Sequence, residues 1–164
     1  MKYKEERKHD FDRITASLKN SNCLHSSGNS IVCEGDSLAM LKKIPDNSIS
    51  LILTDPPYHS TKKKNIAGDT AFSCDNDCID WIKQYSVEWH RILRPNGSIY
   101  MYCSSQMASY LEVMLSGEFN ILSNIVWTKP NEPGFDGWKQ KMNKKSNRAC
   151  YFCDKHQDLY TISI

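Results

Sequence analysis

The sequence predicts a single α/β domain. Segments typical of strands and segments typical of helices alternate along the chain, which is the order of elements in α/β folds. Residues 50–54 form a continuous apolar run bounded by turn residues, which is typical of a strand buried on both faces, as in parallel sheets. The length of 164 residues suits one domain of ordinary size.

The composition is that of a folded protein without a membrane span. Apolar residues make up 40% of the sequence and charged residues 24%, which is normal for a domain with a buried core. No apolar stretch approaches the roughly 18 residues that a transmembrane helix needs. The N-terminal segment carries charges of both signs, unlike a secretory signal. We therefore expect a cytoplasmic protein with no membrane partner.

In the N-terminal half, turn-forming residues separate the expected elements. Gly35-Asp36 ends a short apolar strand, and Asp36 or Ser37 can cap the helix that follows. Pro45-Asp46-Asn47 then turns the chain into the buried run. The elements expected here are a short helix over 11–18 followed by a loop, a strand over 30–34, a helix over 38–43 and a strand over 50–54.

In the C-terminal half, an amphipathic helix over about 78–93 is the strongest feature. Its apolar residues recur at three- and four-residue steps, and we expect this stripe to be core and not a binding surface. The stripe consists of Trp81, Ile82, Tyr85, Trp89 and Ile92. A Pro-Asn-Gly turn ends the helix. The elements expected next are a strand over 98–103, a helix over 107–115 and a strand over 119–127.

Two clusters of basic residues stand out although the net charge is only +2. Clustered Lys and Arg can neutralise phosphates, but such runs are more often solvated loops or tails, and charge alone leaves both interpretations open. The first cluster is Lys62, Lys63 and Lys64, and the second is Lys139, Lys141, Lys144, Lys145 and Arg148.

The seven cysteines are expected to be free thiols, because their number is odd and no secretion signal is present. Cys150 and Cys153 form a CxxC pair with His156 nearby. No second pair has the spacing of a structural zinc site. We therefore expect no metal site.

The segment Asp55-Pro56-Pro57-Tyr58 is a stiff cluster of hydrogen-bond acceptors. Ligands of open α/β sheets bind beyond the carboxyl ends of the strands, where Asp55 is expected to lie. Pro56 holds Asp55 extended, and neither proline has an N–H group. A carboxylate and main-chain carbonyls without competing donors suit the exocyclic amino group of a nucleobase. Tyr58 can stack on that base once it is swung out of the duplex.

The segment EGDSLAMLKKIPDNSISLILTDPPY resembles the amino-methylating DNA methyltransferases, which act on adenine N6 or cytosine N4. RILRPNGSIYMYCS and NIVWTKPN resemble later segments of the subgroup whose catalytic motif comes early, so the resemblance covers about residues 31–137. It implies a Rossmann-like sheet, S-adenosylmethionine as cofactor and double-stranded DNA as substrate. In that family the Asp form of the tetrapeptide is more typical of adenine methylation.

The resemblance also implies roles for individual residues. Asp55 and the carbonyl groups of Pro56 and Pro57 would position and polarise the amine, and Tyr58 would stack on the base. The implied cofactor-binding residues are Asp36, Ser37 and Asp55, and the implied phosphate-binding residues are Lys62, Lys63, Lys64, Lys139 and Lys141.

The family's glycine-rich cofactor turn is missing from the sequence. No two of the seven glycines have the spacing Gly-x-Gly, so we expect a partial sheet that lacks the C-terminal strands carrying this motif. Residues 1–29 are expected to be an N-terminal polar arm and 30–137 the catalytic portion. Residues 138–164 are expected to be a basic, atypical tail, either the start of a target-recognition region or a frameshifted end. A homodimer or a complementing subunit could supply the missing half.

Two functions are compatible with these observations. The first is a site-specific DNA methyltransferase of a restriction–modification system, which passes a methyl group from S-adenosylmethionine directly to N6 of a flipped adenine. The second is a catalytically inactive remnant, or a DNA-binding module that needs a partner for the cofactor half.

Overall fold

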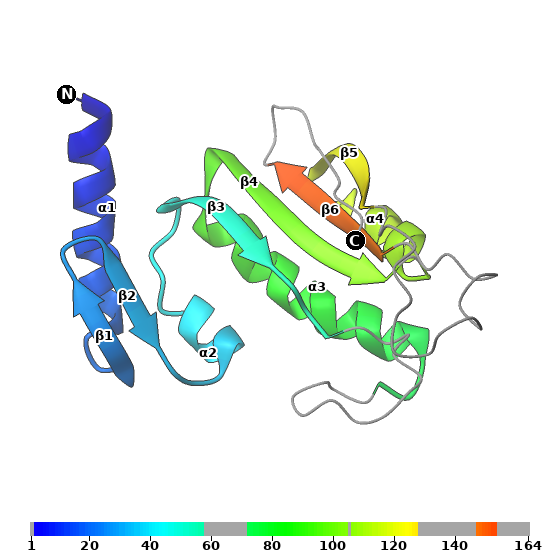
Figure 1. Ribbon diagram of the computed structural model, residues 1–164, viewed down its shortest axis with the longest axis horizontal. Coiled ribbons are helices and arrows are strands. Elements are labelled where there is room, and N and C mark those ends of the chain that lie inside the picture. The colour runs from blue at the N-terminus through cyan, green and yellow to red at the C-terminus, as the bar shows by residue number, and fades with distance from the viewer. Residues whose placement is uncertain (1, 58–71, 105, 128–146, 154–164) are drawn as a thin grey trace, which may run out of the picture.

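The structure, a computed structural model, describes residues 2–57, 72–104, 106–127 and 147–153 (Figure 1). The helices in these residues are α1 (Lys2–Leu18), α2 (Ser37–Leu41), α3 (Asp75–Ile92) and α4 (Ala108–Leu115). The strands are β1 (Cys23–Ser27), β2 (Ser30–Cys33), β3 (Ile49–Thr54), β4 (Leu93–Ser104), β5 (Asn120–Trp127) and β6 (Asn147–Cys153). None of these helices is long and apolar enough to cross a membrane.

The main sheet has four strands in the order β3-β4-β6-β5. β3 runs parallel to β4, with Leu51 opposite Ser98 and Leu53 opposite Tyr100. β6 runs antiparallel to both β4 and β5. The α/β prediction is confirmed, with a mixed sheet. β6 was not foreseen from the sequence, and it brings part of the expected tail into the middle of this sheet.

The core lies between one face of this sheet and helices α3 and α4. Ile99 and Met101 of β4 are fully buried and pack in one cluster with residues of both helices. The helical stripe predicted from the sequence is confirmed as core. Trp81 is half-buried against this core, and the other four residues, Ile82, Tyr85, Trp89 and Ile92, are buried. Burying one such side chain contributes about 1.5–3 kcal/mol, so α3 is the main support of the sheet.

The opposite face of the sheet is open at β3. Leu51 and Leu53 are 55% and 65% exposed, although they belong to the apolar run that was expected to be buried on both faces. Successive strand residues point to opposite faces, so Ile52, between them, packs against the core instead. The prediction of two covered faces is therefore wrong for the described chain, because helices cover only one of them.

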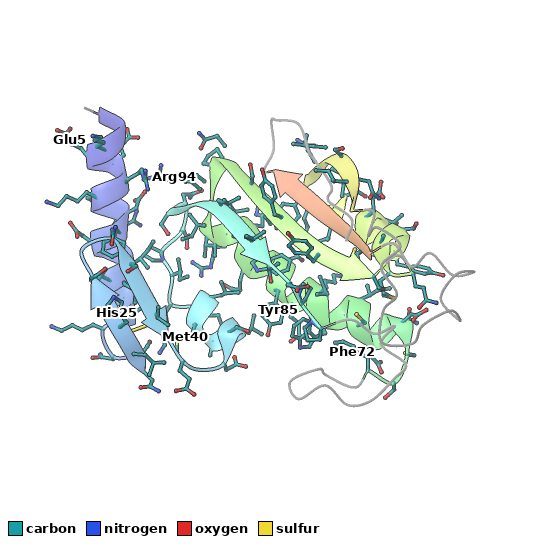
Figure 2. The ribbon with its side chains drawn as sticks, viewed as in Figure 1. Glu5, His25, Met40, Phe72, Tyr85 and Arg94 are labelled. Carbon is teal, nitrogen blue, oxygen red and sulfur yellow. A yellow bond between two sulfur atoms is a disulfide. The ribbon has the colours of Figure 1, made fainter. Side chains whose placement is uncertain are left out.

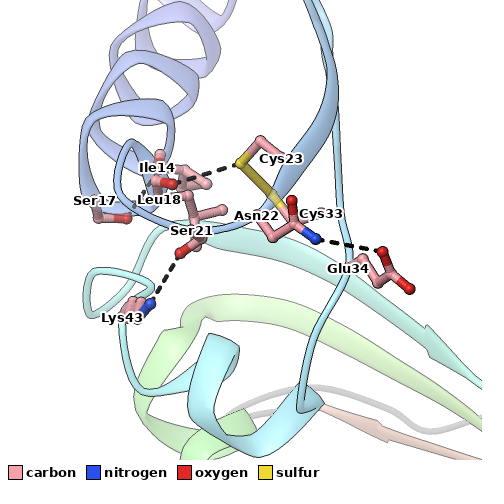
Figure 3. Close-up of a disulfide and its surroundings, with 9 residues drawn as sticks. All are labelled: Ile14, Ser17, Leu18, Ser21, Asn22, Cys23, Cys33, Glu34 and Lys43. Atoms are coloured by element: carbon pink, nitrogen blue, oxygen red, sulfur yellow. Dashed lines mark hydrogen bonds between the residues drawn. A yellow bond between two sulfur atoms is a disulfide. The ribbon is translucent and has the colours of Figure 1, made fainter.

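The N-terminal strands form a separate two-stranded sheet. β2 occupies the segment where a strand was predicted, but it pairs antiparallel with β1 and not with the main sheet. A loop was predicted after the first helix, and this prediction is wrong for Cys23–Ser27, which form β1. Cys23 of β1 lies opposite Cys33 of β2, and the two are joined by a disulfide (Figure 3). The prediction of free thiols is therefore wrong for this pair.

Helix α1 is longer than the predicted helix and docks through a buried carboxylate. Asp10 is only 7% exposed and forms an ion pair with Arg94, at the start of β4 (Figure 2). Arg13, one turn further along α1, donates a hydrogen bond of 3.3 Å to Oδ1 of the same carboxylate. Below the helix, Lys43 donates a hydrogen bond to Ser21 over 2.9 Å (Figure 3). Polar contacts with distant residues thus hold a helix with few apolar residues.

Arg91, near the end of α3, anchors the chain between α2 and β3. Its guanidinium donates to the carbonyl oxygens of Leu41 and Ile44 over 2.9 and 2.8 Å, and it pairs with Asp46 and Glu88. Burial lowers the pKa of Arg91, but the hydrogen bonds and charges of Asp46 and Glu88 raise it by more. The planar guanidinium donates in several directions at once and so fixes where β3 begins. No other type of side chain has N–H donors in this fork-like arrangement.

We predict that Arg91→Met lowers the free energy of unfolding by about 2 kcal/mol, since two main-chain carbonyls and two carboxylates lose a charged donor. Urea denaturation followed by circular dichroism measures this loss. Lys83→Met, at an exposed position on the same helix, is the matched control and should change stability by less than about 0.5 kcal/mol. Equal effects of the two changes would contradict the anchoring role.

Candidate active site

Asp55 follows directly after β3, at the carboxyl end of a strand that is parallel to its neighbour. Its side chain is exposed, whereas Pro56 is buried and Pro57 is half-buried. The carboxylate therefore stands at the edge of the sheet where α/β proteins bind ligands, as the sequence predicted. Tyr58 lies outside the described residues.

The two prolines rest on the core and fix the direction of the segment. They line a small cavity of about 10 Å³ together with residues of α3, β4 and the start of α4. The other lining residues are Cys78, Ile82, Cys103, Ser104, Met107 and Leu111. This space is about that of one water molecule, so no ligand enters behind the prolines. A ligand of Asp55 must approach from the solvent side.

Asp36 caps helix α2, and its carboxylate is exposed. Its Oδ1 accepts a hydrogen bond of 2.7 Å from the main-chain N–H of Ala39, which confirms the capping role predicted from the sequence. A carboxylate has a second oxygen and can bind a ligand while it caps. The hydroxyl of Ser37 lies 3.1 Å from the hydroxyl of Tyr85, so the first turn of α2 is tied to α3 (Figure 2).

Tyr85 is a positioning residue that the sequence did not reveal. The helical stripe identified it as core, and its ring does pack between Trp81 and Trp89, with centroids 4.4 and 6.1 Å away. A buried tyrosine hydroxyl usually has a hydrogen-bond partner. This general rule was the one indication in the sequence that Tyr85 contacts a polar group. Its partner, Ser37, could not be named without the fold.

The remaining predicted site residues lie outside the described part of the chain. These are the two sets of basic residues proposed to contact phosphates, Lys62, Lys63, Lys64, Lys139 and Lys141. Within the described ranges, no three His, Cys, Asp or Glu side chains come together in a way that could hold a metal ion.

The family of DNA methylases matches residues 49–163 of the chain. This range begins at β3 and includes Asp55 and β6, but it leaves out α1, the hairpin and Asp36. The matched part is more than two thirds of the 164 residues.

Two proteins with similar sequences are bacterial methyltransferases. The DNA adenine methyltransferase YhdJ of Escherichia coli is 37% identical over 97 residues, which are 59% of this chain and 32% of that protein. The type II methyltransferase M.HpaI of Haemophilus parainfluenzae is 31% identical over 103 residues, covering 59% and 31% of the two chains. The chain thus spans about a third of the length of these relatives.

Solved structures confirm the fold class. The PvuII DNA methyltransferase, described as cytosine-N4-specific, superposes with a TM-score of 0.63 at 18% identity, over 85% of this chain and 54% of that one. The putative DNA modification methylase TTHA0409 of Thermus thermophilus, solved with S-adenosylmethionine, gives a TM-score of 0.53 at 18% identity, over 75% and 54%. The chain therefore has part of the Rossmann-like fold that is seen in S-adenosylmethionine-dependent methyltransferases.

We predict that Gly35→Ala destabilises the turn that presents Asp36, by about 1–2 kcal/mol of unfolding free energy. Gly35 has φ +155°, and a Cβ atom there would lie 2.6 Å from Cε of Met40. Thermal and urea unfolding test this. Gly28→Ala is the control, because no heavy atom lies within 4 Å of the added carbon. A stability loss of the same size in both variants would rule out the proposed strain.

Proposed function

This chain belongs to the DNA methylase family, and on that basis we propose that it carries the catalytic portion of a site-specific DNA methyltransferase acting on adenine N6. The observation that carries the proposal is the exposed carboxylate of Asp55 on two prolines that rest on the core, at the carboxyl end of a parallel strand. The proposed catalytic residues are Asp55, Pro56, Pro57 and Tyr58.

Asp55 has the chemistry to orient an amino group of a flipped base. The lone pair of such a nitrogen is delocalised into the ring, which makes it a poor nucleophile. A carboxylate oxygen and the proline carbonyls accept hydrogen bonds from its two hydrogens and draw the nitrogen toward tetrahedral geometry. Because neither proline has an N–H group, no donor from the prolines competes for these acceptors. Tyr58 would stack on the base and offset part of the cost of flipping it.

The described residues fit one end of S-adenosylmethionine. Asp36 and Ser37 present an exposed carboxylate and a hydroxyl on the first turn of α2, and both types of group bind the polar edge of an adenosine. When bound, this cofactor would supply a methyl group on a positively charged sulfur. The bond from nitrogen to the methyl carbon would form as the carbon–sulfur bond breaks, the neutral thioether would leave and the amine would release one proton to solvent, with no covalent enzyme intermediate. Asp55 would lie on the amine side of that transfer.

Adenine is favoured over cytosine by the first residue of the motif and by the E. coli relative. The Asp-Pro-Pro-Tyr form is more typical of adenine methylation in the family, and YhdJ is named a DNA adenine methyltransferase. The PvuII enzyme, which shares the fold, is cytosine-N4-specific, so the fold itself is compatible with both bases. The residues proposed to bind the phosphates of double-stranded DNA are Lys62, Lys63, Lys64, Lys139 and Lys141.

A catalytically inactive DNA-binding module is the second candidate. The glycine spacing is the observation that favours it. No two of the seven glycines of the sequence have the Gly-x-Gly spacing of the family's cofactor turn. Close approach of a main chain to the methionine end of the cofactor requires such small residues. Under this alternative the chain binds DNA but transfers no methyl group.

A methyl-transfer assay distinguishes the two functions and identifies the base. Unmethylated DNA and tritiated S-adenosylmethionine are incubated with the full chain, alone and together with the part of the E. coli relative that lies outside the matched segment. We expect the label in N6-methyladenine after digestion to nucleosides. Label in N4-methylcytosine would refute the choice of base, and DNA binding with no label in either preparation would favour the inactive module.

We predict that Asp55→Asn lowers the rate of methyl transfer by about 100-fold or more, since the amide replaces a charged acceptor and adds a competing donor. Affinity for DNA, measured by fluorescence anisotropy, should change much less. Asp12→Asn, at an exposed position on α1, is the matched control and should retain full activity. Activity that survives in Asp55→Asn would remove this residue from the proposed site.

A further inference from the structure

The β1–β2 hairpin has little buried surface of its own. All five residues of β1 are exposed, and in β2 only Ile31 and Cys33 are half-buried. A two-stranded hairpin with so little burial is at best marginally stable in water. The disulfide between Cys23 and Cys33 is therefore the main constraint on this part of the chain.

The disulfide lies at the open end of the hairpin, next to the connection to α2. Cys33 is the last residue of β2, and only Glu34 and Gly35 separate it from Asp36, the cap of α2. Beside the disulfide, the main-chain N–H of Glu34 donates to the carbonyl oxygen of Asn22 over 2.8 Å. The side chains of the same two residues are joined by an exposed hydrogen bond of 3.3 Å (Figure 3). These bonds form only while the two strand ends stay together.

Helix α2 is tied to this end of the hairpin on both sides of its own length. Two residues join its cap to Cys33. Just past its end, Lys43 donates a hydrogen bond to Ser21, which is two residues ahead of Cys23. The remaining support of α2 comes from the hydrogen bonds of α3 described above. Breaking the disulfide therefore removes one of two supports of the turn that presents Asp36.

The surroundings of the disulfide suit both of its redox states. Cys23 is exposed, so a thiol in solution can reach its sulfur. Its Sγ lies 3.5 Å from the carbonyl oxygen of Leu18, the last residue of α1. A disulfide sulfur has no hydrogen to donate, but a thiol has one, so reduction gives Cys23 an acceptor at once. Exposed disulfides are also the class that thiols reduce readily and that serve as regulatory bonds.

We propose that Cys23 and Cys33 form a reversible redox site for dithiols, whose oxidised form holds the turn that presents Asp36 and whose reduced form releases it. The inference rests on the proposed function in one respect, the assignment of Asp36 and Ser37 to the cofactor. Oxidation of the pair then raises the affinity for S-adenosylmethionine, and reduction lowers it. Because α3 still holds α2 after reduction, the loss of affinity is graded and not complete.

The chemical step is thiol–disulfide exchange. A thiolate of the reductant attacks Sγ of Cys23, the sulfur–sulfur bond breaks, and Cys33 leaves as a thiolate that takes up a proton. The second thiolate of the reductant then attacks the reductant's sulfur in the mixed disulfide and releases Cys23, which also takes up a proton. The dithiol is oxidised to its own disulfide, and the protein gains two electrons and two protons.

The test follows the thiol state and the hairpin in the same samples. The full chain is oxidised with glutathione disulfide and then reduced with dithiothreitol. After each step, free thiols are alkylated and the peptides that contain Cys23 and Cys33 are identified by mass spectrometry. We expect the bond to form and break reversibly in the folded chain. Amide hydrogen exchange over residues 22–36 should be slower in the oxidised state by about tenfold or more, since the cross-link closes the hairpin loop.

Two variants and an internal reference complete the experiment. The double variant Cys23→Ser with Cys33→Ser cannot form the bond, so its exchange should match that of the reduced chain under both conditions. Cys74→Ser removes an exposed thiol outside the hairpin and should respond as the unchanged chain does. Exchange over α3 should be equal in the two states, because this helix belongs to the core.

Each other result overturns the inference. These results are a bond that does not form, a bond that dithiothreitol does not break in the folded chain, and equal exchange of residues 22–36 in the two states. A change of exchange that extends equally over α3 would likewise show a general loss of stability and not a local device.

Isothermal titration with S-adenosylmethionine separates this inference from the proposed function. We expect an affinity about tenfold higher in the oxidised chain, a size typical of coupling between two sites. No binding in either state, with exchange that still depends on the disulfide, supports the redox site and refutes the assignment of Asp36 to the cofactor. Equal binding in both states supports that assignment and refutes control of the cofactor by the disulfide.

Discussion

The parallel pairing of β3 with β4 is the interaction on which the candidate site depends. β4 is held by the core through Ile99 and Met101, and it fixes β3 in register, with Thr54 opposite Met101. The chain leaves the sheet immediately after Thr54, so the position of Asp55 is set by main-chain hydrogen bonds. Pro56 and Pro57 then rest on residues from the end of β4 and from α3 and α4. A carboxylate presented in this way needs little side-chain adjustment to meet a ligand, which suits the proposed role of Asp55 in orienting an amine.

Helix α3 connects the two parts of the site. Tyr85, near its middle, holds Ser37 at the start of α2, and Arg91, near its end, holds the carbonyls between α2 and β3. The same helix buries Cys78 and Ile82 behind the prolines. The candidate cofactor residues and the candidate catalytic residue are therefore positioned by one rigid element, although they come from separate segments of the chain.

The sequence predicted the elements whose apolar pattern is strong and missed those held by distant partners. α3, β3 and α4 were found because periodicity and turn residues mark them. β4 was predicted only from residue 98, and the turn predicted before it is wrong, because β4 begins at Leu93 and residues 94–97 form an irregularity within it. Asp36 and Asp55 were proposed as site residues because their motifs are local. The full length of α1 depends on the pairing of Asp10 with Arg94, and β1 depends on its pairing with β2, neither of which a local pattern shows. The contacts of Tyr85 and Arg91 that shape the site join residues 47 to 50 positions apart, so only the fold reveals them.

The ion pair between Asp10 and Arg94 has a practical consequence. Arg94 stands at the start of β4, and because β3 and β4 are parallel, this is the end of the sheet opposite to Asp55. β4 has 12 residues, about 40 Å of extended chain. A fluorophore, purification tag or surface linker attached ahead of α1 would therefore be held at the end of the sheet far from Asp55, where it would not obstruct a ligand that approaches this carboxylate. Protein immobilised for single-molecule measurements is best tethered there.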